Sequence, residues 1–189
     1  MEAGTHCSDI KSRIKVRMMT EDDYQALSNF SCGEDALDNF FHSEVKECVE
    51  RRYLAAYSVL LDNEIVGAFT LMNDALMVKT QYDREDFFYD LQFEASEDMI
   101  DFFLRQSSYP AVNIGHLGTS CKYQSQGIGS VIIDFVVATF QEYRQSGCQF
   151  LTVDALNNPR TNHFYIKKGF NYQTNCDSTA LTRRMYRIL

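Results

Sequence analysis

The sequence lacks the positive charge of a typical nucleic-acid-binding protein and the apolar runs of a membrane protein. Lysine and arginine total 18 against 26 aspartates and glutamates, which leaves a formal net charge of -8 at pH 7. This balance argues against general affinity for nucleic acid or anionic membranes. The longest apolar run, 131–140, contains Asp134 and is too short to cross a bilayer. We therefore expect no membrane partner, and a nucleic-acid partner only in the special case of tRNA.

Signals for metal binding and for secretion are also lacking. No C-x-x-C pair occurs among the six cysteines, which are Cys7, Cys32, Cys48, Cys121, Cys148 and Cys176. Zinc therefore has little support, and we predict no metal. The N-terminal residues lack the apolar stretch of a secretory signal. We expect a cytoplasmic protein with reduced thiols.

The apolar patterns predict one mixed α/β domain over residues 13–189, after a disordered tail over residues 1–12. No repeat, low-complexity tract or linker-like segment divides the domain. Strands are expected over 14–18, 53–61, 65–77, 111–120, 150–153 and 181–188. Helices are expected over 20–28, 34–52, 126–144 and 158–168, with one or two more within 79–108.

The fourth predicted strand changes its apolar parity. Val112 and Ile114 share one parity, whereas Leu117 and Thr119 share the other. Because successive strand residues point to opposite faces, a slip of register would be needed to bury both sets on one face. We predict a β-bulge at residues 115–116. A strand buried on both faces is the alternative.

A glycine-containing segment, Tyr123-Gln124-Ser125-Gln126-Gly127-Ile128-Gly129-Ser130, follows this strand and precedes an apolar helix. Glycines beside a helix start let the backbone approach a ligand closely. The first free N–H groups of the helix and its macrodipole then favour an anion. A G-x-G alone is a weak signal, since a turn with close helix packing has the same pattern.

Two motifs together resemble the GNAT superfamily of acyl-CoA-dependent N-acetyltransferases. The first, Q/R-x-x-G-x-G/A, is met by Gln124, Gly127 and Gly129. The second, N-x-x-A-x-x-F-Y-x-K-x-G-F, is met by Asn158, Phe164, Tyr165, Lys167, Gly169 and Phe170, with Thr161 in place of the alanine. The motifs span about residues 110–172. The resemblance implies a mostly antiparallel central sheet, flanked by helices on both faces, with a bulged fourth strand.

The resemblance implies acetyl-CoA as the cosubstrate. Its pantetheine arm would pair with the main chain of Leu117, Gly118 and Thr119, as an added strand does. Its pyrophosphate would rest on the amides of Gln124, Ser125, Gln126, Gly127, Ile128, Gly129 and Ser130. Asn158 is also assigned to cofactor binding. Lys122 and Arg160 are interpreted as surface charges, with a phosphate contact as the alternative.

The implied chemistry is direct attack of an amine on the thioester. Tyr165 matches the family tyrosine that protonates or hydrogen-bonds the departing sulfur. Many relatives place a glutamate base on the bulged strand, but Asn113 stands there and cannot take the proton. His116, Asp74 and ordered water remain candidate proton acceptors, and entry of an already neutral amine would need none.

The acceptor is expected to be a primary amine of a small molecule, peptide or protein. One alternative is a toxin-like acetyltransferase of aminoacyl-tRNA, because Phe30-Ser31-Cys32-Gly33 followed by Leu37-Asp38-Asn39-Phe40-Phe41 is similar to that subgroup. The other is a non-catalytic CoA-binding module, which the asparagine at 113 would suit. A homodimer is left open.

Overall fold

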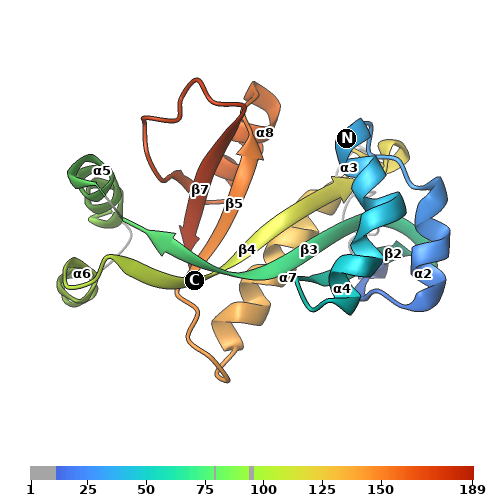
Figure 1. The fold of residues 1–189 in the computed structure, drawn as a ribbon, viewed down its shortest axis with the longest axis horizontal. Helices are drawn as coiled ribbons and strands as arrows, with labels where there is room; N and C mark the ends of the chain where they lie inside the picture. Colours follow the sequence, from blue (N-terminus) through green and yellow to red (C-terminus); the bar gives the residue numbers. More distant parts are fainter. Residues whose placement is uncertain (1–11, 79, 94–95) are drawn as a thin grey trace, which may run out of the picture. The chain divides into compact units, whose positions relative to one another are not determined.

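The computed structural model describes residues 12–78, 80–93 and 96–189. Its strands form a seven-stranded sheet in the order β1-β2-β3-β4-β5-β7-β6 (Figure 1). The strands are β1 (Ile14–Met18), β2 (Ala55–Leu61), β3 (Glu64–Met77), β4 (Ser108–Thr119), β5 (Phe150–Leu156), β6 (Asn171–Tyr172) and β7 (Thr182–Ile188). The sheet is mostly antiparallel and is flanked by helices, which confirms the predicted fold class.

The α-helices are α2 (Glu21–Ala26), α3 (Asp35–Asn39), α4 (Val45–Glu50), α5 (Gln81–Leu91), α6 (Glu97–Leu104), α7 (Ile128–Glu142) and α8 (Pro159–Lys167). The described residues also form two 3₁₀ helices, η1 (Leu27–Asn29) and η3 (Cys121–Tyr123), and one π-helix, η2 (Phe40–Glu44). The chain divides into two compact units. Unit 1 is Met1–Met72 with Ile114–Thr139, and unit 2 is Asn73–Asn113 with Phe140–Leu189. The single domain predicted over 13–189 stays a prediction, and the predicted tail lies, apart from Ser12, outside the described residues.

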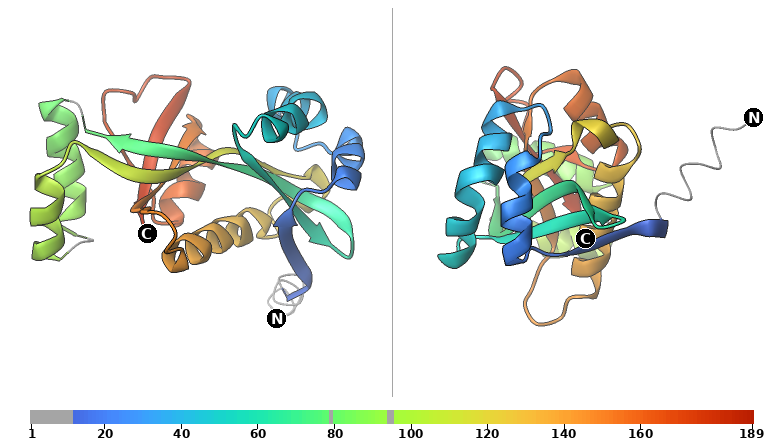
Figure 2. Two further views of the ribbon diagram at one scale, coloured as in Figure 1. Left: turned by 60° about the horizontal axis from the view of Figure 1, so that its bottom comes forward. Right: turned by 90° about the vertical axis from the view of Figure 1, so that its right-hand side faces the viewer.

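In unit 1 the strands lie between two helical layers (Figure 2). Tyr57 of β2 and Phe69 of β3 stack with ring centroids 4.9 Å apart, and both rings contact Phe135 of α7. The opposite face, which includes Ala56 and Ala68, packs against α2, α3 and α4. Asp62 and Asn63 form the β2–β3 turn, and both have positive φ (50° and 69°), which matches the twist of a tight hairpin. This turn joins the two strands that were predicted over 53–61 and 65–77.

The helix predicted over 34–52 is interrupted by a π turn. The backbone runs as α3, then the π element η2, then α4, and Arg51 caps the end. A π turn inserts one residue into the helical period and is frequent at functional sites. The inserted turn begins with Phe40 and Phe41, which are both buried. The prediction of one continuous α-helix over 34–52 was therefore wrong at the π turn.

In unit 2 the aromatic rings of α5 and α6 form a core with the sheet. Phe87 and Phe103 contact Tyr109 of β4 and Phe150 of β5, and all four are almost completely buried. The Tyr109 hydroxyl donates to the Phe103 carbonyl at 2.6 Å, so its polar end is satisfied. The two helices, which fall within the segment 79–108 where one or two were predicted, thus belong to the core of unit 2.

Two further expectations change in the structure. β4 begins at Ser108, before Pro110, and residues 111–114 are buried in succession, as a strand covered on both faces would be. The bulge predicted at residues 115–116 stays a prediction. α7 (Ile128–Glu142) is shorter than the helix predicted over 126–144 and has an exposed side that includes Asp134, Ala138 and Thr139.

Candidate active site

The segment from Gln124 to Ser130, here named the glycine turn, leads from η3 into α7 within unit 1. Ser125 (φ 63°) and Gly127 (φ 87°) have left-handed backbone conformations. At Gly127 this conformation itself requires glycine, because a Cβ is strained there. The Val131 N–H donates to the Gly127 carbonyl at 3.1 Å and begins the helical ladder. The N–H groups of Ile128, Gly129 and Ser130 therefore belong to the first turn of α7, where anions are favoured.

Gln124 is fixed by its own side chain. Its Nε2 donates to the Cys32 carbonyl at 2.7 Å and to the Thr119 carbonyl at 3.3 Å. The carboxamide therefore joins the start of the glycine turn to the end of β4 and to the segment before α3.

Residues 117–119 end β4, which is the last strand of unit 1 in the sheet order. Gly118 is buried, and a Cβ built on it would lie 3.2 Å from Phe41 Cε2 and 3.3 Å from Phe30 Cε1. Packing against these aromatic rings explains this glycine. Leu117 and Thr119, on the opposite face, are half-buried.

His116 lies on the same face of β4 as Gly118. Its ring stacks on Phe40 with centroids 3.5 Å apart and an interplanar angle of 6°. Its Nδ1 hydrogen-bonds the buried Thr70 hydroxyl at 2.9 Å. Burial lowers the pKa of His116 to about 4, so the imidazole is neutral at pH 7. Thr70 was not identified from the sequence, because nothing in the local pattern marks a partner 46 residues away.

Tyr165 lies on α8 in unit 2. Its ring is 95% buried, and it makes edge-to-face contacts with Phe164 and Phe170 at 5.0 and 5.2 Å. Burial raises the pKa of its phenol, which stays protonated at neutral pH. Asn158 caps α8, since its Oδ1 accepts from the Thr161 N–H at 2.9 Å, and Pro159 follows in the first turn. The predicted start of this helix is confirmed, and the contact of Asn158 with a cofactor stays a prediction.

Polar side chains from four strands of unit 2 converge near Asn113. The Asn113 Nδ2 donates to the Thr152 hydroxyl at 3.1 Å, and that hydroxyl donates to the Asp74 carboxylate. Asp74, within β3, also forms an ion pair with Arg184 of β7, which in turn pairs with Asp154 at 2.6 Å. Asn113 and Thr152 are buried, so their hydrogen bonds matter for stability. Arg184 and the Thr152 hydroxyl therefore both engage the Asp74 carboxylate.

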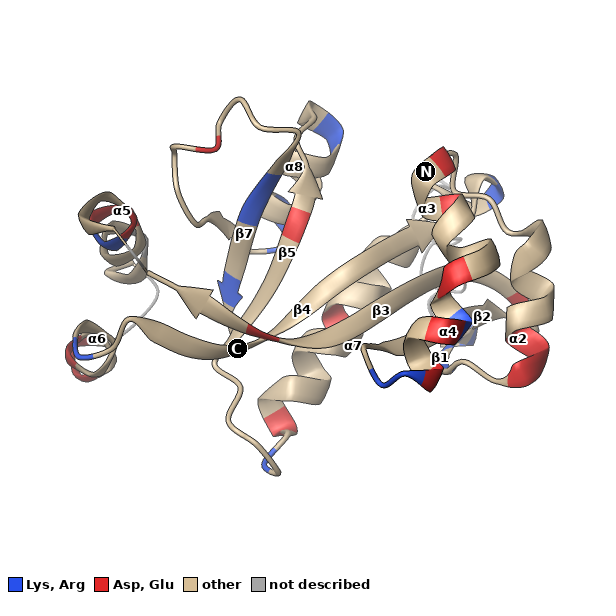
Figure 3. Ribbon diagram, viewed as in Figure 1, with Lys and Arg blue, Asp and Glu red and all other residues tan. Residues whose placement is uncertain are grey.

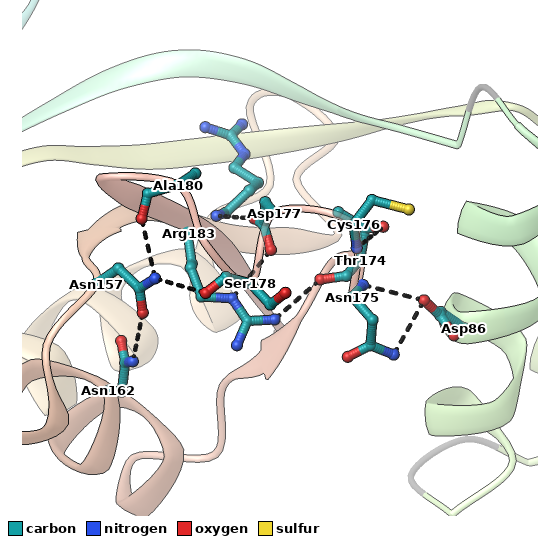
Figure 4. Close-up of polar contacts among 11 residues, drawn as sticks. Asp86, Asn157, Asn162, Thr174, Asn175, Cys176, Asp177, Ser178, Ala180 and Arg183 are labelled. Atoms are coloured by element: carbon teal, nitrogen blue, oxygen red, sulfur yellow. Dashed lines mark hydrogen bonds and ion pairs between the residues drawn. The ribbon is translucent and has the colours of Figure 1, made fainter.

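The loop between β6 and β7 is held by polar contacts at both ends (Figure 4). On one side the Asn157 amide donates to the carbonyls of Ser178 and Ala180 at 3.0 and 2.9 Å. On the other, the Asn175 side chain donates to Asp86 of α5 at 3.2 Å. Two adjacent asparagines therefore have different roles: Asn157 holds this loop, and Asn158 caps α8.

The comparison with protein families decides the assignment. The model described as "Acetyltransferase (GNAT) family" matches residues 18–170. The chain belongs to the GNAT family. It is therefore an acyl-CoA-dependent N-acetyltransferase that uses acetyl-CoA, as the resemblance implied.

Solved structures with the same fold include bacterial toxins. A tyrosine-to-phenylalanine mutant of KacT is 18% identical, with TM-score 0.70, over 93% of this chain and 95% of that chain. A mutant AtaT toxin bound to acetyl-CoA and the C-terminus of the antitoxin AtaR is 20% identical, with TM-score 0.66, over 93% of each chain. AtaT complexed with acetyl-methionyl-tRNAfMet is 20% identical, with TM-score 0.69, over 90% of this chain and 93% of that chain. The comparison with curated proteins gave no match.

The described residues show neither a membrane-spanning helix nor a metal-binding cluster. Within 12–78, 80–93 and 96–189, no helix has the length and apolar character to span a membrane. The same part of the chain holds no cluster of three or more His, Cys, Asp or Glu side chains suited to a metal ion.

Proposed function

We propose that this GNAT enzyme transfers the acetyl group of acetyl-CoA to a primary amine of a small molecule, peptide or protein in the cytoplasm. The amine attacks the thioester directly, so the enzyme must position two substrates and stabilise the departing thiolate. The observation that carries the proposal is the left-handed Gly127 at the N-terminus of α7, which follows β4 through the short η3.

Unit 1 supplies the groups that suit acetyl-CoA. The main-chain N–H and C=O groups at Leu117, Gly118 and Thr119, at the end of β4, are the proposed partners of the pantetheine amides. Amides of the glycine turn and of the first turn of α7 fit a diphosphate. Lys122 is paired with Glu64 at 3.6 Å and is strongly exposed, which supports its interpretation as a surface charge.

Tyr165 is proposed as the general acid. Burial raises the pKa of the phenol, so it keeps its proton at pH 7 and can donate it in a hydrogen bond to the departing sulfur. The phenol is a weaker acid than the CoA thiol, whose pKa is about 8.5, so this hydrogen bond stabilises the thiolate without complete transfer of the proton. The C–S bond of the thioester breaks as the amide C–N bond forms, and CoA leaves as a thiolate that accepts a hydrogen bond from the Tyr165 hydroxyl. The proton lost by the amine passes to water and balances the one that the thiolate takes up from water.

Neither named base candidate is well suited to removing the amine proton. The pKa of His116 is about 4, so its imidazole holds a proton weakly near neutrality. Asp74 is engaged by Arg184 and Thr152. We therefore propose that the amine binds in its neutral form or loses its proton to water.

Tyr165→Phe tests the acid role, because it removes one hydroxyl and keeps the buried ring. We expect turnover to fall roughly 10- to 100-fold, while the Kd for acetyl-CoA changes little. The measurement is thiol release from acetyl-CoA against a panel of polyamines, amino acids, peptides and charged tRNA. Tyr172→Phe in β6 is the matched control. Unchanged turnover in Tyr165→Phe would remove the acid role, and binding without thiol release for any amine would favour the non-catalytic module.

Gly127→Glu tests the diphosphate site. A carboxylate at this position conflicts sterically and electrostatically with phosphate, so calorimetry should detect no acetyl-CoA binding. Gly127→Asn separates the causes, because asparagine tolerates positive φ but carries a Cβ. Wild-type affinity in Gly127→Glu would contradict the proposed site.

Acetylation of aminoacyl-tRNA is the second candidate, because neighbours of the same fold are toxins and one is complexed with acetyl-methionyl-tRNAfMet. Charge argues against it. Acidic side chains lie on α2 and α4, and the basic residues of β7 (Figure 3) include Arg183 and Arg184, which are already paired with carboxylates. Activity on charged tRNA that falls steeply with salt, together with arrested translation on expression, would favour the toxin function.

A further inference from the structure

The turn before α3 lies against the glycine turn within unit 1. This turn, Phe30–Gly33, is here named the FSCG turn. The Cys121 N–H donates to the Ser31 carbonyl at 2.9 Å, and a Cβ built on Gly33 would lie 3.3 Å from Cys121 Sγ. The Gln124 side chain adds its bond to the Cys32 carbonyl at 2.7 Å. Backbone and side-chain contacts thus join two segments that are about ninety positions apart in the sequence.

Gln124 also holds a strained piece of backbone. Ser125, the next residue, has φ 63°, a conformation that non-glycine residues adopt rarely. Such conformations persist where the surroundings over-determine them. The two bonds from the Gln124 carboxamide, to Cys32 and to Thr119, provide this restraint. Order in the glycine turn and order in the FSCG turn therefore depend on the same side chain.

The FSCG turn is anchored in turn to the helices that follow it. The Asp38 carboxylate of α3 accepts from the Ser31 hydroxyl at 2.6 Å and from the Cys32 N–H at 2.8 Å. His42 of η2 hydrogen-bonds the Phe30 carbonyl at 2.6 Å. The contacts therefore continue from the glycine turn to the helices that carry Phe40, the ring on which His116 stacks.

We propose that Gln124 is a positioning residue that couples occupation of the glycine turn by CoA to the order of the FSCG turn. The inference rests on the proposed function, which places the diphosphate at the glycine turn. A ligand that binds the ordered glycine turn favours the conformation in which Gln124 bonds Cys32. The coupling is reciprocal, so loosening the FSCG turn weakens CoA binding by the same factor, roughly five-fold.

Hydrogen exchange measured by mass spectrometry, with and without CoA, tests the coupling. In the wild type, CoA should protect peptides covering both residues 126–131 and residues 31–33. Gln124→Met keeps the length of the side chain but has no donor, so protection should remain at 126–131 and be lost at 31–33. Gln124→Arg restores N–H donors, which the family motif allows at this position, and should restore protection at both sites.

The reciprocal arm uses Asp38→Ala, with Asp35→Ala on the same helix as the matched control. Calorimetry should show the Kd for CoA raised roughly five-fold in Asp38→Ala and by less than two-fold in Asp35→Ala. If CoA protects residues 126–131 of the wild-type protein from hydrogen exchange but does not protect residues 31–33, the coupling is wrong and the proposed function stands. An unchanged Kd in Asp38→Ala would also overturn the coupling. No protection at 126–131 would instead refute the diphosphate site itself, and the coupling with it.

Discussion

Replacement of Gly118 by alanine tests whether packing or backbone freedom keeps this position a glycine. The added Cβ would lie 3.2 Å from Phe41 Cε2, 3.3 Å from Phe30 Cε1 and 3.4 Å from Cys32 Cβ. All three neighbours are buried, with exposed fractions of 1%, 5% and 7%. The contact with Cys32 is close to an ordinary van der Waals distance, but the two rings cannot swing into solvent and must each shift by a few tenths of an ångström inside a close-packed layer.

Two opposing effects set the size of the change. Overpacking of a buried site costs about 1–3 kcal/mol of the free energy of unfolding. Replacing glycine by alanine also restricts the unfolded chain, which stabilises by about 0.4–1 kcal/mol where the backbone conformation suits both residues. Overpacking is the larger effect, and we expect a net destabilisation of about 1–2 kcal/mol. We also expect weaker acetyl-CoA binding, because β4 must move away from the rings.

Urea unfolding at constant m-value measures the first effect, and calorimetry with acetyl-CoA measures the second. Gly147→Ala is the matched control, since its Cβ would meet only Pro110 Cγ, at the ordinary distance of 3.8 Å. It should leave stability unchanged or slightly raised. If the midpoint of urea unfolding is the same for Gly118→Ala and the wild type, the packing explanation is refuted. The close approach of a ligand would then be the reason for a glycine at this position.

Two further predictions concern His116 and Asn158. The pKa of His116 is about 4 in the folded protein and about 6.5 in the unfolded chain. Between these pH values the unfolded chain therefore binds more protons than the folded protein. The free energy of unfolding should fall by up to roughly 3 kcal/mol as the pH drops from 6.5 to 4. Urea titrations across this window should show a shallower loss in His116→Gln, and an equal slope in both proteins would exclude a buried neutral imidazole. Asn158→Ala should destabilise by about 1 kcal/mol through loss of the α8 cap, whereas Asn158→Ser should retain it. Acetyl-CoA affinity lost in both variants would assign Asn158 to the cofactor, and normal affinity in Asn158→Ser would leave it as a cap.

Local signals in the sequence predicted most of the elements. The start of α8 follows from Asn158 and Pro159, and its end from Gly169, whose φ is 77°. The helix predicted over 20–28 corresponds to α2 with the short η1, and the strands predicted over 53–61 and 65–77 correspond to β2 and β3. These signals are readable because the cause and the structure lie within a few residues of each other.

Features that depend on distant neighbours were missed. The π turn at η2 interrupts a run whose apolar spacing favours a plain helix, and burial of Phe40 and Phe41 against β4 accompanies it. The two-residue strand β6 is formed by its pairing with β7 rather than by its own composition. Asp74 and Thr152 likewise meet across strands far apart in the sequence. Tertiary packing decides each of these, and periodicity carries no information about it.

Gly127 and Gly118 are glycine for different physical reasons. The reason is local backbone conformation at Gly127 and packing against distant side chains at Gly118. Gly127 has a left-handed backbone that any Cβ would strain, so its identity follows from local conformation in the motif itself. Gly118 is held against rings contributed by η2 and by the segment before α3. The strand proposed to pair with pantetheine is therefore positioned by the helical layer that follows the FSCG turn. Changes in that layer, even where they touch no substrate, should alter acetyl-CoA affinity through β4, because close-packed aromatic contacts transmit a displacement rather than absorb it.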